Sequence, residues 1–223
     1  MTVHGRIAGS SNVTLLVTCT AGSEELLGVY KPAKGERPLW DFPEGLYRNE
    51  VAAFELSEEL GWQVVPETVE RTDAPFGVGS VQRLVPEDGR SHFFTLRDDP
   101  KWRFSLESIA AFDVVANNAD RKSGHVLLAE RRLWAIDNGL CFHRDPQKLR
   151  TVIWDFAGLA LPERLVEDLC ALIEGGVGPR LEAALNEAEI EALVERAARL
   201  VQDPTFPFPP QDREWPPYPW PLV

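Results

Sequence analysis

The stretch that decides the fold lies in the middle of the chain and reads Phe112-Asp113-Val-Val-Ala-Asn117-Asn118-Ala-Asp120-Arg121-Lys122-Ser-Gly-His125-Val-Leu-Leu, with Ile136-Asp137-Asn138-Gly139-Leu140 following shortly after. A helix is expected over 106–118, and short strands are expected over 126–128 and 133–136. Asp120 and Asp137 then flank one hairpin and can converge at its open end. Converging carboxylates with a histidine between them suit a divalent cation and a proton acceptor. The alternative for Asp137 is a turn residue, because Asn-Gly is a strong turn signal.

Two charged residues upstream form a second candidate group. Strands are expected over 13–18 and 26–30, and Lys31 ends the second of them. A lysine at that place either grips a phosphate from a rigid element or simply reaches water. A helix expected over 46–60, ended by Gly61, carries Glu50 on its inward stripe. Glu50 there needs a cation, which Lys31 can supply, unless it is a half-exposed residue at the helix edge.

Small residues and a further strand complete the first part of the chain. Gly9-Ser10-Ser11-Asn12 can bring backbone N–H groups close to phosphate oxygens, although a plain turn is the alternative. The segment lacks the Gly-Lys-Ser/Thr of a Walker loop. A strand is expected over 80–85, and the turn at 86–89 is the predicted boundary between two lobes.

The C-terminal part is expected to be mainly helical. Apolar residues recur at helical spacing over 162–174, with Pro162 at the first helical position, and over 181–201. From Pro204 to Val223 the chain is rich in Pro, Trp and Phe and cannot form a helix or a central strand. We expect an extended arm on the protein's own surface, or else a ligand for a partner's aromatic groove.

Composition excludes several classes of protein. The 223 residues are 44% hydrophobic, enough for a folded core. The net charge of −12, from 23 basic and 35 acidic residues, argues against nucleic acid and against stable docking on an anionic membrane. No apolar run suits a membrane span and no signal peptide is visible. Three scattered cysteines indicate reduced thiols, so a cytoplasmic location is expected.

In their order and spacing, these residues resemble the protein-kinase-like superfamily. The likeness is strongest to the phosphatidylinositol 3-/4-kinase-like group, and within it to type II phosphatidylinositol 4-kinases. Their catalytic loop has the form Asp…Asn-x-Asp-Arg-x-x-x-Asn and their metal motif reads Ala-Ile-Asp-Asn-Gly-Leu, as at 113–125 and 135–140 here. Actinobacterial proteins of the phosphatidylinositol-kinase-like type are similar over nearly the whole length. The resemblance implies a bilobal α+β fold: an antiparallel-sheet N-lobe over 1–86, a mainly helical C-lobe over 87–203, and the arm over 204–223.

The resemblance also implies roles for individual residues. It makes Lys31 the holder of the ATP phosphates and Glu50 the partner of Lys31. It makes Asp120 the catalytic residue that orients or deprotonates the acceptor, and Asp137 a ligand of Mg²⁺. The remaining expected contacts concern the nucleotide: Ser10 and Ser11 lie near its phosphates, and the strand with Gln82 and Leu84 offers backbone groups to adenine.

Two departures from the family pattern bear on function. His125 stands where the family has a metal-ligating Asn, which implies one metal, Mn²⁺ in place of Mg²⁺, or weak activity. The Cys-rich insertion that anchors type II lipid kinases to membranes is absent. The leading hypothesis is an ATP-dependent transfer of phosphate to a hydroxyl of an inositol or lipid headgroup, another small polyol, or a protein Ser/Thr. The alternatives are AMP transfer and a nucleotide-binding pseudokinase that presents its Pro/Trp tail to a protein partner.

Overall fold

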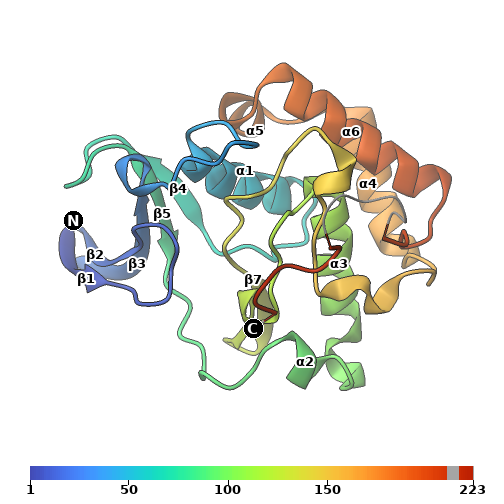
Figure 1. Cartoon of the computed structure of the whole chain (residues 1–223), viewed down its shortest axis with the longest axis horizontal. Helices are drawn as coiled ribbons and strands as arrows, with labels where there is room; N and C mark the ends of the chain where they lie inside the picture. Colours follow the sequence, from blue (N-terminus) through green and yellow to red (C-terminus); the bar gives the residue numbers. More distant parts are fainter. Residues whose placement is uncertain (210–215, 223) are drawn as a thin grey trace.

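The computed structural model describes residues 1–209 and 216–222 of the chain. It has an α+β fold with two lobes, an antiparallel sheet in the N-terminal part and mostly helices beyond it (Figure 1). Pro210 and Trp215, which belong to the proline-rich runs of the tail, lie outside the described residues. Within those residues, none of the helices has the length and apolar content needed to cross a bilayer.

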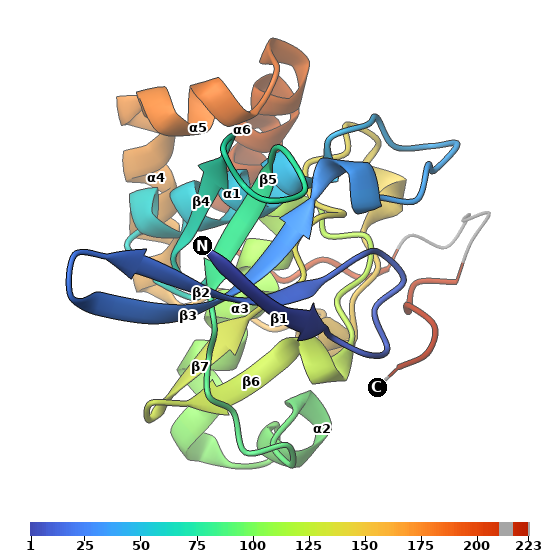
Figure 2. The same ribbon diagram turned by 90° about the vertical axis from the view of Figure 1, so that its left-hand side faces the viewer.

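The N-terminal sheet has five strands, each antiparallel to its neighbours, in the order β1-β2-β3-β5-β4 (Figure 2). The strands are β1 (Thr2–Arg6), β2 (Leu15–Ala21), β3 (Glu24–Pro32), β4 (Thr68–Arg71) and β5 (Gly79–Arg83). Lys31 pairs with Ser80 in the β3–β5 ladder, so its backbone is fixed by the centre of the sheet. Alternate residues of β2 and β3, including Val17 and Tyr30, are buried, as the period of two requires.

Helix α1 (Leu46–Glu59) lies between this sheet and the C-terminal helices (Figure 1). It begins after Gly45, whose φ of 92° favours glycine. The Glu36 carboxylate accepts the N–H groups of Gly45, Leu46 and Tyr47 and so caps the free end of the helix. Gly61, with φ 66°, ends the helix as the sequence predicts.

The remaining helices form the C-terminal part. They are α2 (Phe93–Leu96), α3 (Arg103–Ala116), α4 (Glu163–Gly175), α5 (Pro179–Ala184) and α6 (Glu187–Gln202). A separate hairpin of β6 (Val126–Ala129) and β7 (Arg132–Ala135) follows α3. Short 3₁₀ helices cover Ala33–Gly35, Pro100–Trp102, Ser123–His125, Pro146–Lys148 and Ile153–Phe156.

One large apolar core holds α1 against the C-terminal helices. Leu56 of α1, Phe112 of α3, Leu165 of α4 and Leu193 of α6 all belong to it and are almost fully buried. Burial of each such side chain contributes about 1.5–3 kcal/mol. Helix α5 also packs on α1, and so do strands β4 and β5 of the N-terminal sheet, so α1 is held from both lobes.

Two details of the helical prediction are wrong. The stretch 181–201 is two helices, because Asn186 caps α6 by accepting the N–H of Glu189, whose carboxylate accepts the Asn186 N–H in return. Pro162 is the residue before α4 rather than its first residue. The strands β1 and β4 and the short helix α2 were not predicted.

The described parts of the C-terminal tail lie on the protein's own surface. Phe206 is buried, and its ring centroid is 5.8 Å from that of Phe156. Further on, the carbonyl of Pro217 accepts the N–H of Thr151 at 3.2 Å, and the carbonyl of Leu222 accepts the N–H of Ser123 at 2.8 Å. The last contact reaches the segment that follows Asp120.

Candidate active site

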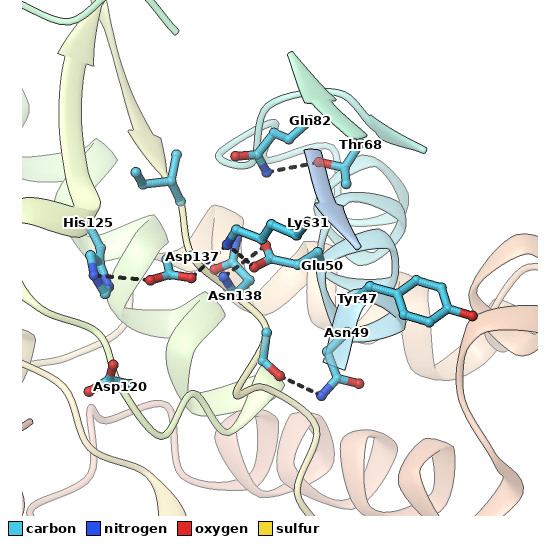
Figure 3. A network of polar contacts seen from close by, with 12 residues as sticks. Lys31, Tyr47, Asn49, Glu50, Thr68, Gln82, Asp120, His125, Asp137 and Asn138 are labelled. Atoms are coloured by element: carbon cyan, nitrogen blue, oxygen red, sulfur yellow. Dashed lines mark hydrogen bonds and ion pairs between the residues drawn. The ribbon is translucent and has the colours of Figure 1, made fainter. Parts of the chain in front are cut away.

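Lys31, Glu50 and Asp137 form one cluster, although they lie far apart in the sequence (Figure 3). The Lys31 ammonium donates to Glu50 Oε1 and, at 2.7 Å, to Asp137 Oδ1. Glu50 Oε2 accepts the backbone N–H of Asn138 at 3.0 Å. The cluster therefore joins strand β3, helix α1 and the segment after β7 through two carboxylates and one cation.

The environment favours the charged forms of Lys31 and Asp137. The side chain of Glu50 is 4% exposed and that of Asp137 51%, so the cluster opens to solvent on the Asp137 side. Burial alone would lower the pKa of Lys31, but the carboxylates of Asp137 and Glu50 outweigh it and raise that pKa. The Lys31 ammonium in turn lowers the pKa of Asp137. Because the Asp137 carboxylate is open to solvent, the Lys31 ammonium can leave it and pair with an anionic ligand that enters the site.

A residue that the sequence reasoning missed fixes the same segment to α1. The side-chain amide of Asn49 donates to the carbonyls of Gly139 at 2.8 Å and Cys141 at 3.0 Å. Asn49 is buried beside Glu50 on the helix. Its only signal in the sequence is a polar residue next to Glu50, because its partners are backbone carbonyls, which any residue carries.

Asp120 lies in the same region but outside the Lys31 cluster, with its own cation (Figure 3). Its backbone N–H donates to Asn118 Oδ1 at 2.9 Å, and Lys122 Nζ lies 2.9 Å from its Oδ2. Burial raises the pKa of Asp120, while Lys122 opposes that shift. The pKa of this carboxylate is thus higher than that of a solvated aspartate, which suits a group that accepts a proton. Lys122 is a second functional candidate that the sequence spacing did not indicate.

Arg121 connects helix α3 to the segment that contains Asp137. It is fully buried, and its Nε and Nη2 pair with the Asp113 carboxylate on α3, with Nη2 3.0 Å from Oδ1. Its Nη1 donates to the Ile136 carbonyl at 2.5 Å and its Nη2 to Asn138 Oδ1 at 2.7 Å. One guanidinium therefore sets the positions of the residues on both sides of Asp137.

His125 faces Asp137, with Nε2 at 3.4 Å from Oδ2. Burial lowers the pKa of His125 to about 4, so the ring is neutral near pH 7. Its Nδ1 accepts the Lys122 N–H at 3.4 Å, which places the ring hydrogen on Nε2, toward Asp137. In this tautomer the Nε2 hydrogen faces the Asp137 carboxylate and the ring offers a cation no free lone pair. The expected metal ligation by His125 therefore requires the other tautomer.

The donor set fits a cation that a nucleotide brings with it. No group of three or more His, Cys, Asp or Glu side chains within residues 1–209 and 216–222 could hold a metal ion. Mg²⁺ commonly takes one or two protein carboxylates and completes its shell with phosphate oxygens and water. The half-exposed Asp137 supplies such a carboxylate.

The residues expected to bind adenine are partly engaged with the protein. Gln82 is buried, and its backbone pairs with Val29 of β3 and with Thr68 of β4. Its side-chain amide donates to Thr68 Oγ1 at 2.9 Å, away from the Lys31 cluster (Figure 3). The N–H of Leu84 donates to the Leu27 carbonyl at 3.0 Å. The next N–H, that of Val85, has no backbone acceptor among the described residues. Val85 packs on Ala129 and Trp134 of the β6–β7 hairpin, so the crossing between the lobes lies beside the strand that leads to Asp137.

Ser10 and Ser11 lie in the connection between β1 and β2, closed by the N–H of Ile7 donating to the Thr14 carbonyl at 2.8 Å. Neither serine makes a hydrogen bond to the Lys31 cluster in the described part of the chain. The structure therefore brings together Lys31, Glu50, Asp137 and His125, places Asp120 beside them, and leaves both serines without a contact to the cluster.

Comparison with solved structures defines the class of fold. The Helicobacter pylori proinflammatory kinase CtkA superposes with a TM-score of 0.51 at 12% identity, covering 92% of this chain and 93% of that one. The structure of hydra Fam20 with sugar gives a TM-score of 0.52 at 15% identity, covering 87% and 81%. The chain has a protein-kinase-like fold.

Sequence comparison gives a nearer relative. Protein Rv2133c of Mycobacterium tuberculosis is 37% identical over 259 aligned positions, covering 99% of this chain and 91% of that protein. The chain belongs to the family of protein Rv2133c. No family model matches it.

Proposed function

We propose that this protein is an ATP-dependent phosphotransferase that moves the γ-phosphoryl group to a hydroxyl of an acceptor. The observation that carries the proposal is the cluster in which Lys31 binds both Glu50 and Asp137. This cluster places a cation from the sheet, a carboxylate from α1 and a carboxylate from the segment after β7 at one point. Phosphoryl transfer relies mainly on positioning and charge, and such a cluster supplies both.

The residues then have distinct roles in the transfer. Lys31 leaves Asp137, binds the α- and β-phosphates, and stays oriented by Glu50. Asp137 holds the divalent cation, Mg²⁺ or Mn²⁺, and His125 orients it through the second oxygen. Bound there, the cation neutralises the phosphate charge. Asp120 accepts the proton of the acceptor hydroxyl while the oxygen of that hydroxyl bonds to the γ-phosphorus. The bond from the γ-phosphorus to the β-phosphate oxygen breaks, and ADP leaves with that electron pair.

The nucleotide base is proposed to lie at the crossing between the lobes. The N–H of Val85, which has no backbone acceptor among the described residues, is the donor for adenine in place of the two expected groups. The Gln82 backbone is paired within the sheet, and the N–H of Leu84 donates to Leu27. Ser10 and Ser11 approach the phosphates by movement of the β1–β2 connection. We place the lobe boundary after Pro86 and the end of the second lobe before the arm at 204–223, and the reaction in the cytoplasm.

The nature of the acceptor is a separate part of the proposal. The catalytic-loop and metal motifs resemble those of phosphatidylinositol kinases, which favours a polyol hydroxyl such as that of an inositol headgroup. Lys122 Nζ lies 2.9 Å from the Asp120 carboxylate. Its positive charge is therefore close to the place where the γ-phosphoryl group meets the acceptor, and it can stabilise the negative charge of that group during transfer.

Isothermal titration of ATP with Mg²⁺, and then with Mn²⁺, tests the proposal. We expect metal-dependent binding to the wild type that is lost in Asp137→Ala. Asp98→Ala is the control, because the Asp98 side chain is 90% exposed and its nearest ion pair, with Arg97, is at 4.0 Å. Absence of ATP binding to the folded wild type with either metal would overturn the proposal.

A further inference from the structure

A cavity of about 200 Å³ opens at the backbone that leads into Asp120 and is lined by none of Lys31, Glu50 and Asp137. One wall is the β3–α1 connection with Trp40, Asp41 and Phe42, and the other is the segment with Lys148 and Arg150. Ala119, the residue before Asp120, also lines it. The cavity is smaller than the roughly 300–1,000 Å³ of drug-sized ligand sites, which suits a small molecule or a single headgroup.

Arg150 is fixed against the backbone on both sides of Asp120. Its N–H donates to the Asn118 carbonyl at 2.9 Å, and its carbonyl accepts the Arg121 N–H at 3.1 Å. Its Nε donates to the Ala119 carbonyl at 2.9 Å. Within the described residues, neither Nη atom of Arg150 has a hydrogen-bond or ion-pair partner. The guanidinium is therefore oriented by the loop that carries Asp120, and its outer edge remains available.

The other cation of the cavity is already neutralised. Lys148 Nζ lies 2.7 Å from Asp41 Oδ2 and sits over the Trp40 ring at 5.1 Å from its centroid. The His143 ring also contacts Asp41, at 2.9 Å from its carbonyl, so this wall is held in place from two sides. Within the described residues no carboxylate lies at ion-pair distance from Arg150, whose charge acts on Asp120 from further away. The planar fork of its guanidinium matches phosphate and carboxylate oxygens.

We infer that this cavity is the acceptor site and that Arg150 selects acceptors that carry a phosphate or carboxylate next to the reacting hydroxyl. The inference rests on the proposed function, whose transfer step it leaves unchanged. The oxyanion binds the Nη atoms of Arg150, and the hydroxyl of the same small molecule reaches Asp120. The same chemistry is offered by a soluble phosphorylated polyol and by the headgroup of a phospholipid.

Equilibrium binding separates this inference from the proposed function. Protein saturated with ADP and Mg²⁺ is titrated with glycerol 3-phosphate, glycerate and neutral glycerol. Vesicles of phosphatidylcholine, with and without phosphatidylinositol, test the lipid source. We expect binding of at least one anionic probe but not of glycerol, weakened by about 10- to 100-fold in Arg150→Ala, since a charge-assisted bidentate contact is lost. Arg150→Lys keeps the charge without the fork and is expected to fall between the two.

Arg144→Ala is the matched control, because Arg144 is exposed and lines the neighbouring cavity rather than this one. ATP titrations of the same variants show whether the nucleotide site is intact. Anion binding unchanged in Arg150→Ala, equal binding of glycerol, or no anion binding by protein that binds ATP would overturn the inference. Absence of ATP binding in every variant would instead contradict the proposed function.

Discussion

Replacing Glu50 by Gln tests the centre of the site with a change of one atom. Both partners of the Glu50 carboxylate, the Lys31 ammonium and the Asn138 N–H, are donors. A Gln amide can accept only one of them, and its NH₂ group then faces the other donor, whichever way the amide is turned. The side chain is only 4% exposed, so bulk solvent does not compensate for the mismatched donor.

The magnitude follows from what is lost and what remains. Lys31 keeps Asp137, so the full cost of a broken buried pair does not apply. The loss of one hydrogen bond to a charged group is worth about 1.5–3 kcal/mol. In Glu50→Gln, Lys31 also remains with Asp137 rather than turning to phosphate. We therefore expect ATP affinity to fall by roughly 10- to 150-fold and the unfolding free energy by about 1.5–3 kcal/mol.

Titration calorimetry with ATP and Mg²⁺, beside urea unfolding of the same samples, measures both effects. Glu58→Gln is the control, because Glu58 is exposed on the same helix and the chemical change is identical. A folded Glu50→Gln protein that binds ATP within about twofold of the wild type, less than 0.5 kcal/mol, would refute the role given to the Lys31–Glu50 pair.

Three further predictions concern the surroundings of the cluster. Arg121→Met leaves the Asp113 carboxylate buried without its cation, so urea unfolding should show a loss of about 3–5 kcal/mol, and a loss below 1 kcal/mol would contradict the bracing role. Deletion of 216–223 removes the Leu222 carbonyl, which accepts the Ser123 N–H near Asp120. We expect this deletion to slow phosphoryl transfer while ATP affinity is retained. An equal loss of transfer rate and ATP affinity would contradict this prediction. The pKa of His125 falls from 6.5 to about 4 on folding, so between pH 6 and pH 5 the unfolded state takes up a proton that the folded state does not. Lowering the pH from 6 to 5 in metal-free buffer should therefore reduce the unfolding free energy of the wild type by about 1 kcal/mol more than that of His125→Asn, measured by urea unfolding. Equal losses would contradict a buried neutral ring.

Local sequence patterns predict the regular elements that carry most of the site. Short runs of apolar and β-branched residues predict β2 and β3, and the stripe through Glu50 with Gly61 after it predicts α1. The edge strands β1 and β4 were missed, because the first contains a glycine and the second has only four residues, three of them polar. The break between α5 and α6 had a visible signal, since Asn186 is followed three residues later by Glu189.

The site itself was only partly accessible to sequence reasoning. The pairing of Lys31 with Glu50 could be expected, because a carboxylate on an inward helix face needs a cation. The contacts of Asn49 could not, since they end on backbone carbonyls. Those of Arg121 with Asp113, Ile136 and Asn138 could not either, since they depend on how distant segments cross. The direction of the His125 ring is likewise set by the Lys122 N–H in the folded chain.

Parallel reactions with ATP labelled at the γ-phosphate or at the α-phosphate test the central claim most directly. With Mg²⁺ or Mn²⁺ and the anionic polyols as acceptors, we predict that the wild type moves the γ-label to an acceptor and leaves the α-label in ADP, and that Asp120→Asn does so far more slowly. Transfer of the α-label with release of pyrophosphate would show AMP transfer instead. Failure of the folded wild type to turn over either label with any acceptor class would contradict the assignment of Asp120 and Asp137 to phosphoryl transfer.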